Sequence, residues 1–176
     1  MRDCIKAMLY AYPLLDTVSE DYRQHIQNKA ILSYLRVEPA GNIAERIAFE
    51  ILEKRVLERF KTQVETILGG LTDAERALVD IRYFKRGEKA KQALLRVLGE
   101  DTLGERRYFR MQSRLLDKLT RCFERIGLTK EYFEEELADI DVFKKTLRYT
   151  KNGKAERATE SERKWLGHES IGYAVK

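Results

Sequence analysis

Six basic residues recur at spacings of three or four between positions 107 and 125, and we call them the basic stripe: Arg107, Arg110, Arg114, Lys118, Arg121 and Arg125. At 100° per residue of an α-helix they fall within a sector about 80° wide. A guanidinium group offers N–H donors in a planar fork that matches the oxygens of a phosphate or the edge of a guanine base. The spacing therefore predicts a helix with one cationic face that suits a polyanion.

The excess charge of the chain is local to this segment. Residues 82–125 hold 13 Lys and Arg against 6 Asp and Glu, whereas the whole protein has a net charge of +5. A confined positive surface between neutral flanks is typical of proteins that bind nucleic acid. The alternative is an ordinary solvated helix face. Neighbouring like charges on a helix each cost roughly 0.2 to 0.5 kcal/mol, which favours the binding interpretation.

The opposite side of the same helix is apolar. It comprises Tyr108, Met111, Leu115, Leu116, Leu119, Cys122, Phe123 and Ile126. This side predicts contact with a hydrophobic core, so the core would hold the helix and leave the basic stripe outward. We expect the helix to run to about Ile126.

Helix-start and helix-stop signals surround the stripe. Thr72 with Glu75 resembles a capping box that begins a short helix ending near Phe84, and Thr102 with Glu105 repeats the signal before the stripe. Between them, 88–98 reads as a helix and 99–101 as a turn containing Gly99. Two helices joined by a short turn predict a helix-turn-helix, whose second helix enters the major groove of DNA.

The rest of the chain also reads as helical, because period-2 alternation is missing and only two prolines occur. A first short helix should end at Pro13, and a second follows. Arg36 to Gly41 reads as a loop, and Asn42 with Glu45 predicts a further capping box. A long helix should then run from Ile43 to Leu68 and end at the glycine pair that follows. We therefore predict an all-α fold: an N-terminal helical bundle with a long central helix, then the helix-turn-helix module.

The long helix carries apolar residues on more than one side. One stripe is Phe49, Leu52, Val56, Phe60, Val64 and Ile67, and a second is Ile43, Ala44, Ile47, Ala48 and Ile51. It is expected to pack against the first two helices. Two alternatives stay open: a spine buried wholly within one chain, and a homodimer through the N-terminal helices.

Several other kinds of site are not indicated. Two cysteines and two histidines give no zinc-binding or Cys/His catalytic spacing, and no catalytic triad, P-loop or dinucleotide motif occurs. Acidic residues at 134–141 follow Thr129, a suitable N-cap, and favour a helix start over a metal site in a nuclease. No apolar run is long enough to span a membrane. We expect no enzyme activity, no cofactor, no metal and a cytoplasmic protein.

We expect the chain to divide into three segments. These are an N-terminal helical region at 1–70, the DNA-binding module at 71–127, and a C-terminal helix with a polar tail at 128–176. Within the second segment, LTDAERALVDIRYF, VLG and ERRYFRMQSRLLDKL stand in order between Leu71 and Phe123. This stretch resembles region 4 of bacterial sigma factors and the ArpU-like phage transcription regulators. The resemblance covers about 53 of 176 residues. No part resembles the sigma module that opens promoter DNA, which favours a phage or prophage regulator.

The resemblance implies roles for individual cations. Arg106, Arg107 and Arg110 would contact base edges, and Arg114 would lie at the edge of the groove. The phosphate contacts would come from Arg86, Lys89 and Lys91. The remaining cations, Lys118, Arg121 and Arg125, would touch the DNA backbone or a protein partner. The implied function is sequence-specific DNA binding that regulates transcription, with double-stranded DNA and RNA polymerase as candidate partners. The alternatives are a DNA-packaging protein similar to a small terminase and a protein adaptor that binds RNA polymerase.

Overall fold

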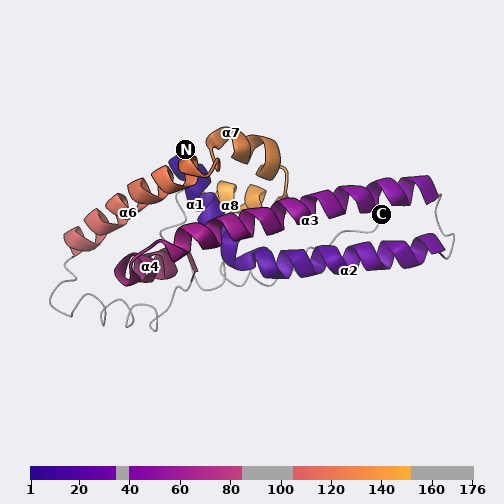
Figure 1. Ribbon diagram of the computed structural model, residues 1–176, viewed down its shortest axis with the longest axis horizontal. Helices are drawn as coiled ribbons and strands as arrows, with labels where there is room; N and C mark the ends of the chain where they lie inside the picture. Colours follow the sequence, from indigo (N-terminus) through magenta and orange to yellow (C-terminus); the bar gives the residue numbers. More distant parts are fainter. Residues whose placement is uncertain (35–39, 85–104, 152–176) are drawn as a thin grey trace.

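A computed structural model describes residues 1–34, 40–84 and 105–151 of the chain. Every regular element in these ranges is a helix, and the all-α prediction is confirmed there (Figure 1). The elements are α1 Arg2–Ala11, the 3₁₀ turn η1 Tyr12–Leu14, α2 Leu15–Tyr34, α3 Ala40–Gly69, α4 Asp73–Val79, the π-helical turn η2 Asp80–Phe84, α6 Glu105–Arg125, α7 Lys130–Tyr132, the π-helical turn η4 Phe133–Leu137 and α8 Asp141–Lys151.

Pro13 acts as expected at the end of the first helix. The α-helix stops at Ala11, and the next three residues form a 3₁₀ turn with the proline in its first positions. A proline has no N–H to donate and fits the start of a helical turn. The chain changes direction here and enters α2.

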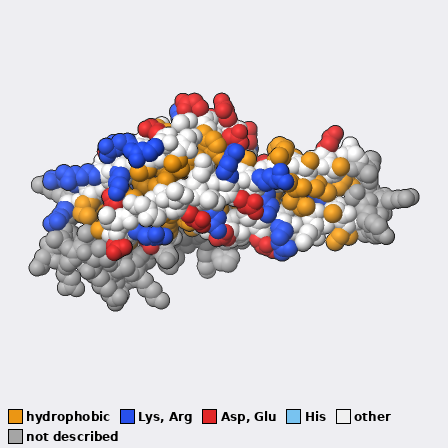
Figure 2. Space-filling model, in the orientation of Figure 1, with side chains coloured by type: hydrophobic (Ala, Val, Ile, Leu, Met, Phe, Trp, Pro, Cys, Tyr) orange, Lys and Arg blue, Asp and Glu red, His pale blue; other side chains and the backbone are white. Residues whose placement is uncertain are grey.

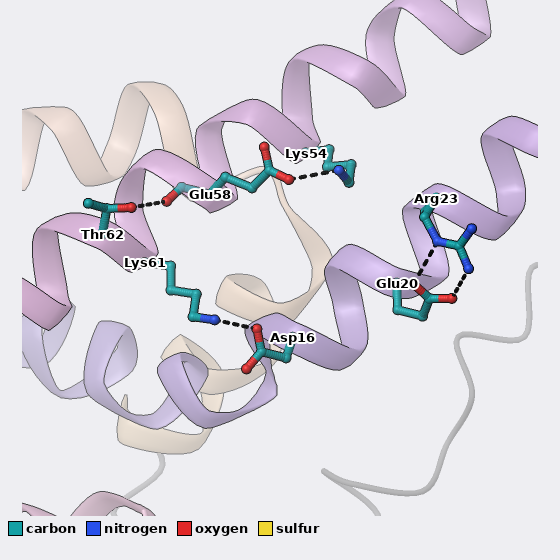
Figure 3. Close-up of polar contacts among 7 residues, drawn as sticks. All are labelled: Asp16, Glu20, Arg23, Lys54, Glu58, Lys61 and Thr62. Atoms are coloured by element: carbon teal, nitrogen blue, oxygen red, sulfur yellow. Dashed lines mark hydrogen bonds and ion pairs between the residues drawn. The ribbon is translucent and has the colours of Figure 1, made fainter.

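Helices α2 and α3 form a long antiparallel hairpin that extends away from the remaining helices (Figure 1). Polar contacts join the two helices along its length. Lys61 Nζ lies 2.5 Å from Asp16 Oδ1 near the base (Figure 3), and Lys29 Nζ lies 2.5 Å from Glu50 Oε1 nearer the tip. Other ion pairs lie within a single helix, such as that of Lys54 with Glu58 at 2.7 Å in α3. The register of the hairpin is thus marked by paired charges.

The prediction of a capping box at Asn42 and Glu45 is wrong. Helix α3 already begins at Ala40, so Asn42 lies inside its first turn. A glycine in a helix costs about 1 kcal/mol relative to alanine, and α3 includes Gly41 in spite of this cost. The glycine pair after Leu68 ends the helix as expected.

The hydrophobic core encloses α1, which is buried on nearly all sides. Ile5, Met8 and Leu9 have no exposed surface. Helix α1 contacts α6, α8 and η2, so segments far apart in sequence meet on it. The ring of Tyr10 lies 5.0 Å from that of Tyr83 and 5.4 Å from that of Tyr149. One core is thus shared by the N-terminal, central and C-terminal segments.

Three phenylalanines fix the C-terminal helices on α3. The ring of Phe143 in α8 stands edge-on to Phe60 of α3 at 5.2 Å and to Phe133 at 6.0 Å. All three side chains are fully buried. Edge-to-face pairs of this kind add stabilisation beyond the buried area itself.

The apolar stripe on α3 is covered along only half of its length. Phe60 and Val64 are fully buried, but Phe49 is 62% exposed and Leu52 is 58% exposed. The interpretation of α3 as a spine buried wholly within one chain is therefore wrong. The expected packing on α2 holds along the hairpin, and the half of α3 nearer Gly69 also contributes to the core that contains α1.

Candidate nucleic-acid interface

Helix α6 carries the basic stripe, and its apolar side is buried as the sequence predicts. Leu115, Leu116, Leu119 and Phe123 belong to the hydrophobic core. Tyr108, Met111, Cys122 and Ile126 pack against that core while remaining partly exposed. The helix is therefore fixed by one face along most of its length.

Polar contacts tie α6 to two other elements. The Gln112 amide donates to the carbonyl oxygen of Leu78 at 3.3 Å and to the Tyr108 hydroxyl at 3.1 Å. Arg2 of α1 donates to Asp117 on the neighbouring face of α6. When packing and hydrogen bonds hold one face of a helix, the side chains on its other face keep a defined position. These contacts give the stripe a rigid support.

Five arginines of the stripe are exposed: Arg107, Arg110, Arg114, Arg121 and Arg125. Within the described ranges, no ion pair involves any of them, and Arg121 makes only a long hydrogen bond of 3.4 Å to the carbonyl oxygen of Asp117. Figure 2 shows Lys and Arg side chains gathered over the α6 end of the molecule. The guanidinium groups are thus available to an anion from solution.

Lys118 differs from the other members of the stripe. Its ammonium group lies 2.6 Å and 2.8 Å from the two carboxylate oxygens of Glu75 and is half-buried. Burial by itself raises the pKa of Glu75, but hydrogen bonds from Lys118 and from the backbone N–H of Thr72 outweigh it, and the pKa is lowered. Lys118 therefore serves first as a link between α6 and α4.

The Thr72–Glu75 capping box that begins α4 is confirmed. Glu75 N–H donates to Thr72 Oγ1 at 3.4 Å, and Thr72 N–H donates to Glu75 Oε2 at 3.0 Å. Glu75 thus caps α4 with the same carboxylate that holds Lys118. The ion pair and the start of α4 depend on one side chain.

A shallow groove of about 470 Å³ follows the line where α6 meets α4. Its walls include Glu75, Met111, Arg114, Lys118 and Arg121. Two exposed arginines of the stripe therefore border an apolar floor. Asp117 lines the same groove, so the lining carries acidic as well as basic side chains.

The other predicted contact residues lie outside the described side chains of the structure. Arg106 belongs to the first turn of α6, but its side chain lies outside the described part of the structure. Arg86, Lys89 and Lys91 also lie outside the described residues, as do the expected helix at 88–98 and its turn. The helix-turn-helix pairing itself stays a prediction.

The end of α6 is set by Gly127, whose φ of 84° lies in the left-handed region. Leu128 N–H donates to the Phe123 carbonyl at 2.9 Å, and Gly127 N–H donates to the Glu124 carbonyl at 3.1 Å. This is the Schellman pattern, which satisfies the last carbonyls of a helix. Thr129 then caps α7 through the N–H of Tyr132 at 3.2 Å, as the sequence predicts.

A second, acidic pocket of about 530 Å³ lies between α2, α3 and the start of α8. Its lining includes the carboxylates of Glu45, Glu50, Glu53, Asp139 and Asp141 and the cations Lys29 and Arg46. Burial raises the pKa of Glu53, and the nearby Glu50 and Asp141 carboxylates add to the rise. Five carboxylates against two cations make this pocket, within the described residues, less suited to a polyanion than the exposed arginines of α6.

Sequence reasoning missed two kinds of residue at the interface. The partners Glu75 and Arg2 lie 43 and 115 positions from the α6 residues that they bind, and no local pattern connects them. Neither predicted face of the helix includes Phe109, yet it is about half exposed and stands between Arg107 and Arg110 in the chain. An exposed aromatic ring at a helix start can contact a thymine methyl group.

No family model, curated protein or solved structure matches this chain. Among the described residues, no group of three or more His, Cys, Asp and Glu side chains is arranged to hold a metal ion. Within the same ranges, every helix is too short or too polar to cross a membrane. Helix α6, with its buried apolar face and its exposed arginines, is therefore the described element that bears most directly on function.

Proposed function

We propose that this protein is a sequence-specific DNA-binding regulator of transcription that presents α6 to the major groove of duplex DNA. The observation that carries the proposal is a row of exposed arginines, without ion pairs in the described structure, on a helix whose opposite face is buried. An α-helix fits the major groove, where arginine reads guanine through its N7 and O6 atoms. Arginines further along the helix would contact phosphates.

Two sequence features support the same proposal. Residues 71–123 resemble sigma region 4 and the ArpU-like phage regulators, in which the corresponding helix reads DNA. The positive charge is also concentrated in this segment and not spread over the surface. A transcription regulator of phage or prophage origin fits both features, with RNA polymerase as a second candidate partner.

The test is selection of duplexes from a random DNA pool, followed by a salt titration on the selected sequence. Replacing Arg107 and Arg110 by alanine should weaken binding and reduce the slope of log K against log salt by about two, because two phosphate or base contacts with their counterions are lost. The matched control replaces Arg23 and Arg55 on the α2–α3 hairpin, which removes the same charge far from α6. We expect the control to bind like the wild type.

Equal affinity and slope for the α6 variant and the control would contradict the assignment of the site. Two other outcomes would replace the proposed function. Ring-shaped oligomers that bind DNA without sequence preference would indicate a packaging protein similar to a small terminase. Absence of DNA binding at low salt, with retained binding to RNA polymerase, would indicate an adaptor.

A further inference from the structure

The half of the α2–α3 hairpin farthest from the core exposes apolar side chains of α3. Ala48 is exposed, and Phe49 and Leu52 are more than half exposed, although the same stripe is fully buried at Phe60. Figure 2 shows hydrophobic side chains gathered over this part of the hairpin. Adjacent exposed apolar groups on one helix face mark an interaction site more often than an ordinary surface.

The residues of this face are arranged symmetrically about Leu52. Glu45 precedes Leu52 by seven residues and Arg59 follows it by seven. Seven residues make about two helical turns, so all three side chains lie on one face. The Glu45 side chain is exposed, and that of Arg59 is 58% exposed. An acidic and a basic group thus stand at equal distances on either side of an apolar centre.

This arrangement is complementary to itself in one orientation. When two copies of α3 cross antiparallel with Leu52 on the two-fold axis, Glu45 of each copy falls opposite Arg59 of the other. Val56 then falls opposite the small Ala48. In a parallel arrangement Glu45 would lie opposite Glu45 and Arg59 opposite Arg59, and like charges that face each other oppose association.

The shape of the molecule allows the antiparallel arrangement. In Figure 1, α7 stands against the half of α3 nearer the core, and the other half of α3 lies clear of it. Arg59 marks the boundary, because it contacts Glu136 at 3.6 Å and the Tyr132 ring at 5.9 Å. The uncovered length from Glu45 to Arg59 is about 21 Å at 1.5 Å per residue.

We infer that two copies of this chain associate antiparallel through the uncovered half of α3, with Leu52 at the two-fold axis. The occupant of the apolar face is therefore the same face of a second copy. The contact places four helices side by side, two from each hairpin. The inference names the surface and the register of a homodimer and does not depend on nucleic-acid binding.

Sedimentation equilibrium of the full chain tests the association. Wild-type protein should dimerise in a concentration-dependent manner, and Leu52→Glu should weaken the dimer by roughly tenfold or more, because two carboxylates would be buried at the axis. Ile31→Glu is the matched control, since Ile31 is also 58% exposed but belongs to α2. A wild-type monomer at all concentrations, or equal effects of the two substitutions, would overturn the inference. Circular dichroism checks that each variant is folded.

Disulfide cross-linking tests the register. Under oxidised glutathione, Leu52→Cys should form a covalent dimer, because two Leu52 positions meet at the axis. Phe49→Cys should not, since antiparallel packing separates the two copies of position 49 by about 9 Å along the helix, beyond the Cα separation that a disulfide spans. The wild type controls for Cys4 and Cys122. Cross-linking of Phe49→Cys at the same yield, or none with Leu52→Cys, would overturn the antiparallel register.

Discussion

At the scale of single residues, Glu75 links two contacts that bear on the candidate interface. Its carboxylate accepts hydrogen bonds from the backbone of Thr72 and from Lys118. The first contact begins α4, and the second attaches α4 to α6. One acidic group outside the basic stripe therefore joins the start of α4 to α6, in addition to the core packing of α6.

Glu75→Gln should lower the free energy of unfolding at pH 7 by about 1 kcal/mol, because a partly exposed charged hydrogen bond is lost. The folded-state pKa of Glu75 lies below its unfolded value. The stabilisation is therefore fully present above an unfolded pKa of about 4.3 and disappears as the pH falls through the folded pKa. Urea denaturation at a series of pH values from 7 to 3 measures the difference between variant and wild type.

Glu65→Gln is the control, because within the described residues the polar contact of Glu65 is an exposed one of 3.8 Å with Lys61. We expect it to match the wild type at every pH. A deficit of Glu75→Gln that stayed constant down to pH 3 would show that the charge of Glu75 is not its cause.

The residue types of the interface could be predicted from sequence, but their pairing could not. A period of three or four identifies Arg107, Arg114 and the apolar face opposite them from local spacing alone. That Lys118 turns to Glu75 depends on how α4 and α6 pack, and 43 residues separate the two. Among the six cations, only the folded structure distinguishes a structural lysine from exposed arginines.

At the scale of elements, helix ends explain which boundaries could be predicted. The signals at Thr72 and Thr129 correspond to observed caps, because each threonine directly follows a residue outside any helix. The equally good signal at Asn42 fails because α3 already includes Ala40 and Gly41 before it. A capping motif states where a helix can begin, and tertiary contacts decide whether it begins earlier.

Gly127→Ala should lower the free energy of unfolding by about 1 kcal/mol or more, because an L-residue is strained at positive φ. No atom lies within 4 Å of the added Cβ, so the cost is conformational and not steric. Gly69→Ala, which also meets no atom within 4 Å and has no positive φ, should be neutral or slightly stabilising. Thermal unfolding measures both variants. Equal stability of the two would contradict the argument from backbone conformation.

At the scale of the whole molecule, the shared core was beyond prediction from sequence. The helical class followed from composition and periodicity, whereas contact between Tyr10 and Tyr149 requires the complete topology. The sequence pattern also indicates that the long helix α3 has two apolar sides. Which half of it would be covered depends on where the C-terminal helices return to the core, and no local pattern contains that information.

Phe143→Ala should lower the free energy of unfolding by about 3 to 5 kcal/mol, since it removes a fully buried ring and its contacts with Phe60 and Phe133. Because the core is shared, α6 should lose its structure in the same transition as α8. Far-UV and near-UV circular dichroism should therefore report one midpoint in denaturant. Phe109→Ala, at a half-exposed ring, is the control and should change stability by less than about 0.5 kcal/mol.

Within the described residues, exposed arginines on α6 are separated from the carboxylates between α2, α3 and α8, and this separation contributes to an electric dipole moment. A charged body of this kind rotates in the field of a polyanion before the two surfaces touch. Its encounter rate would then exceed that of a uniformly charged sphere carrying the same +5. Because screening shortens the field to about 8 Å at physiological ionic strength, this gain in rate would vanish first as salt is added, before the complex itself dissociates.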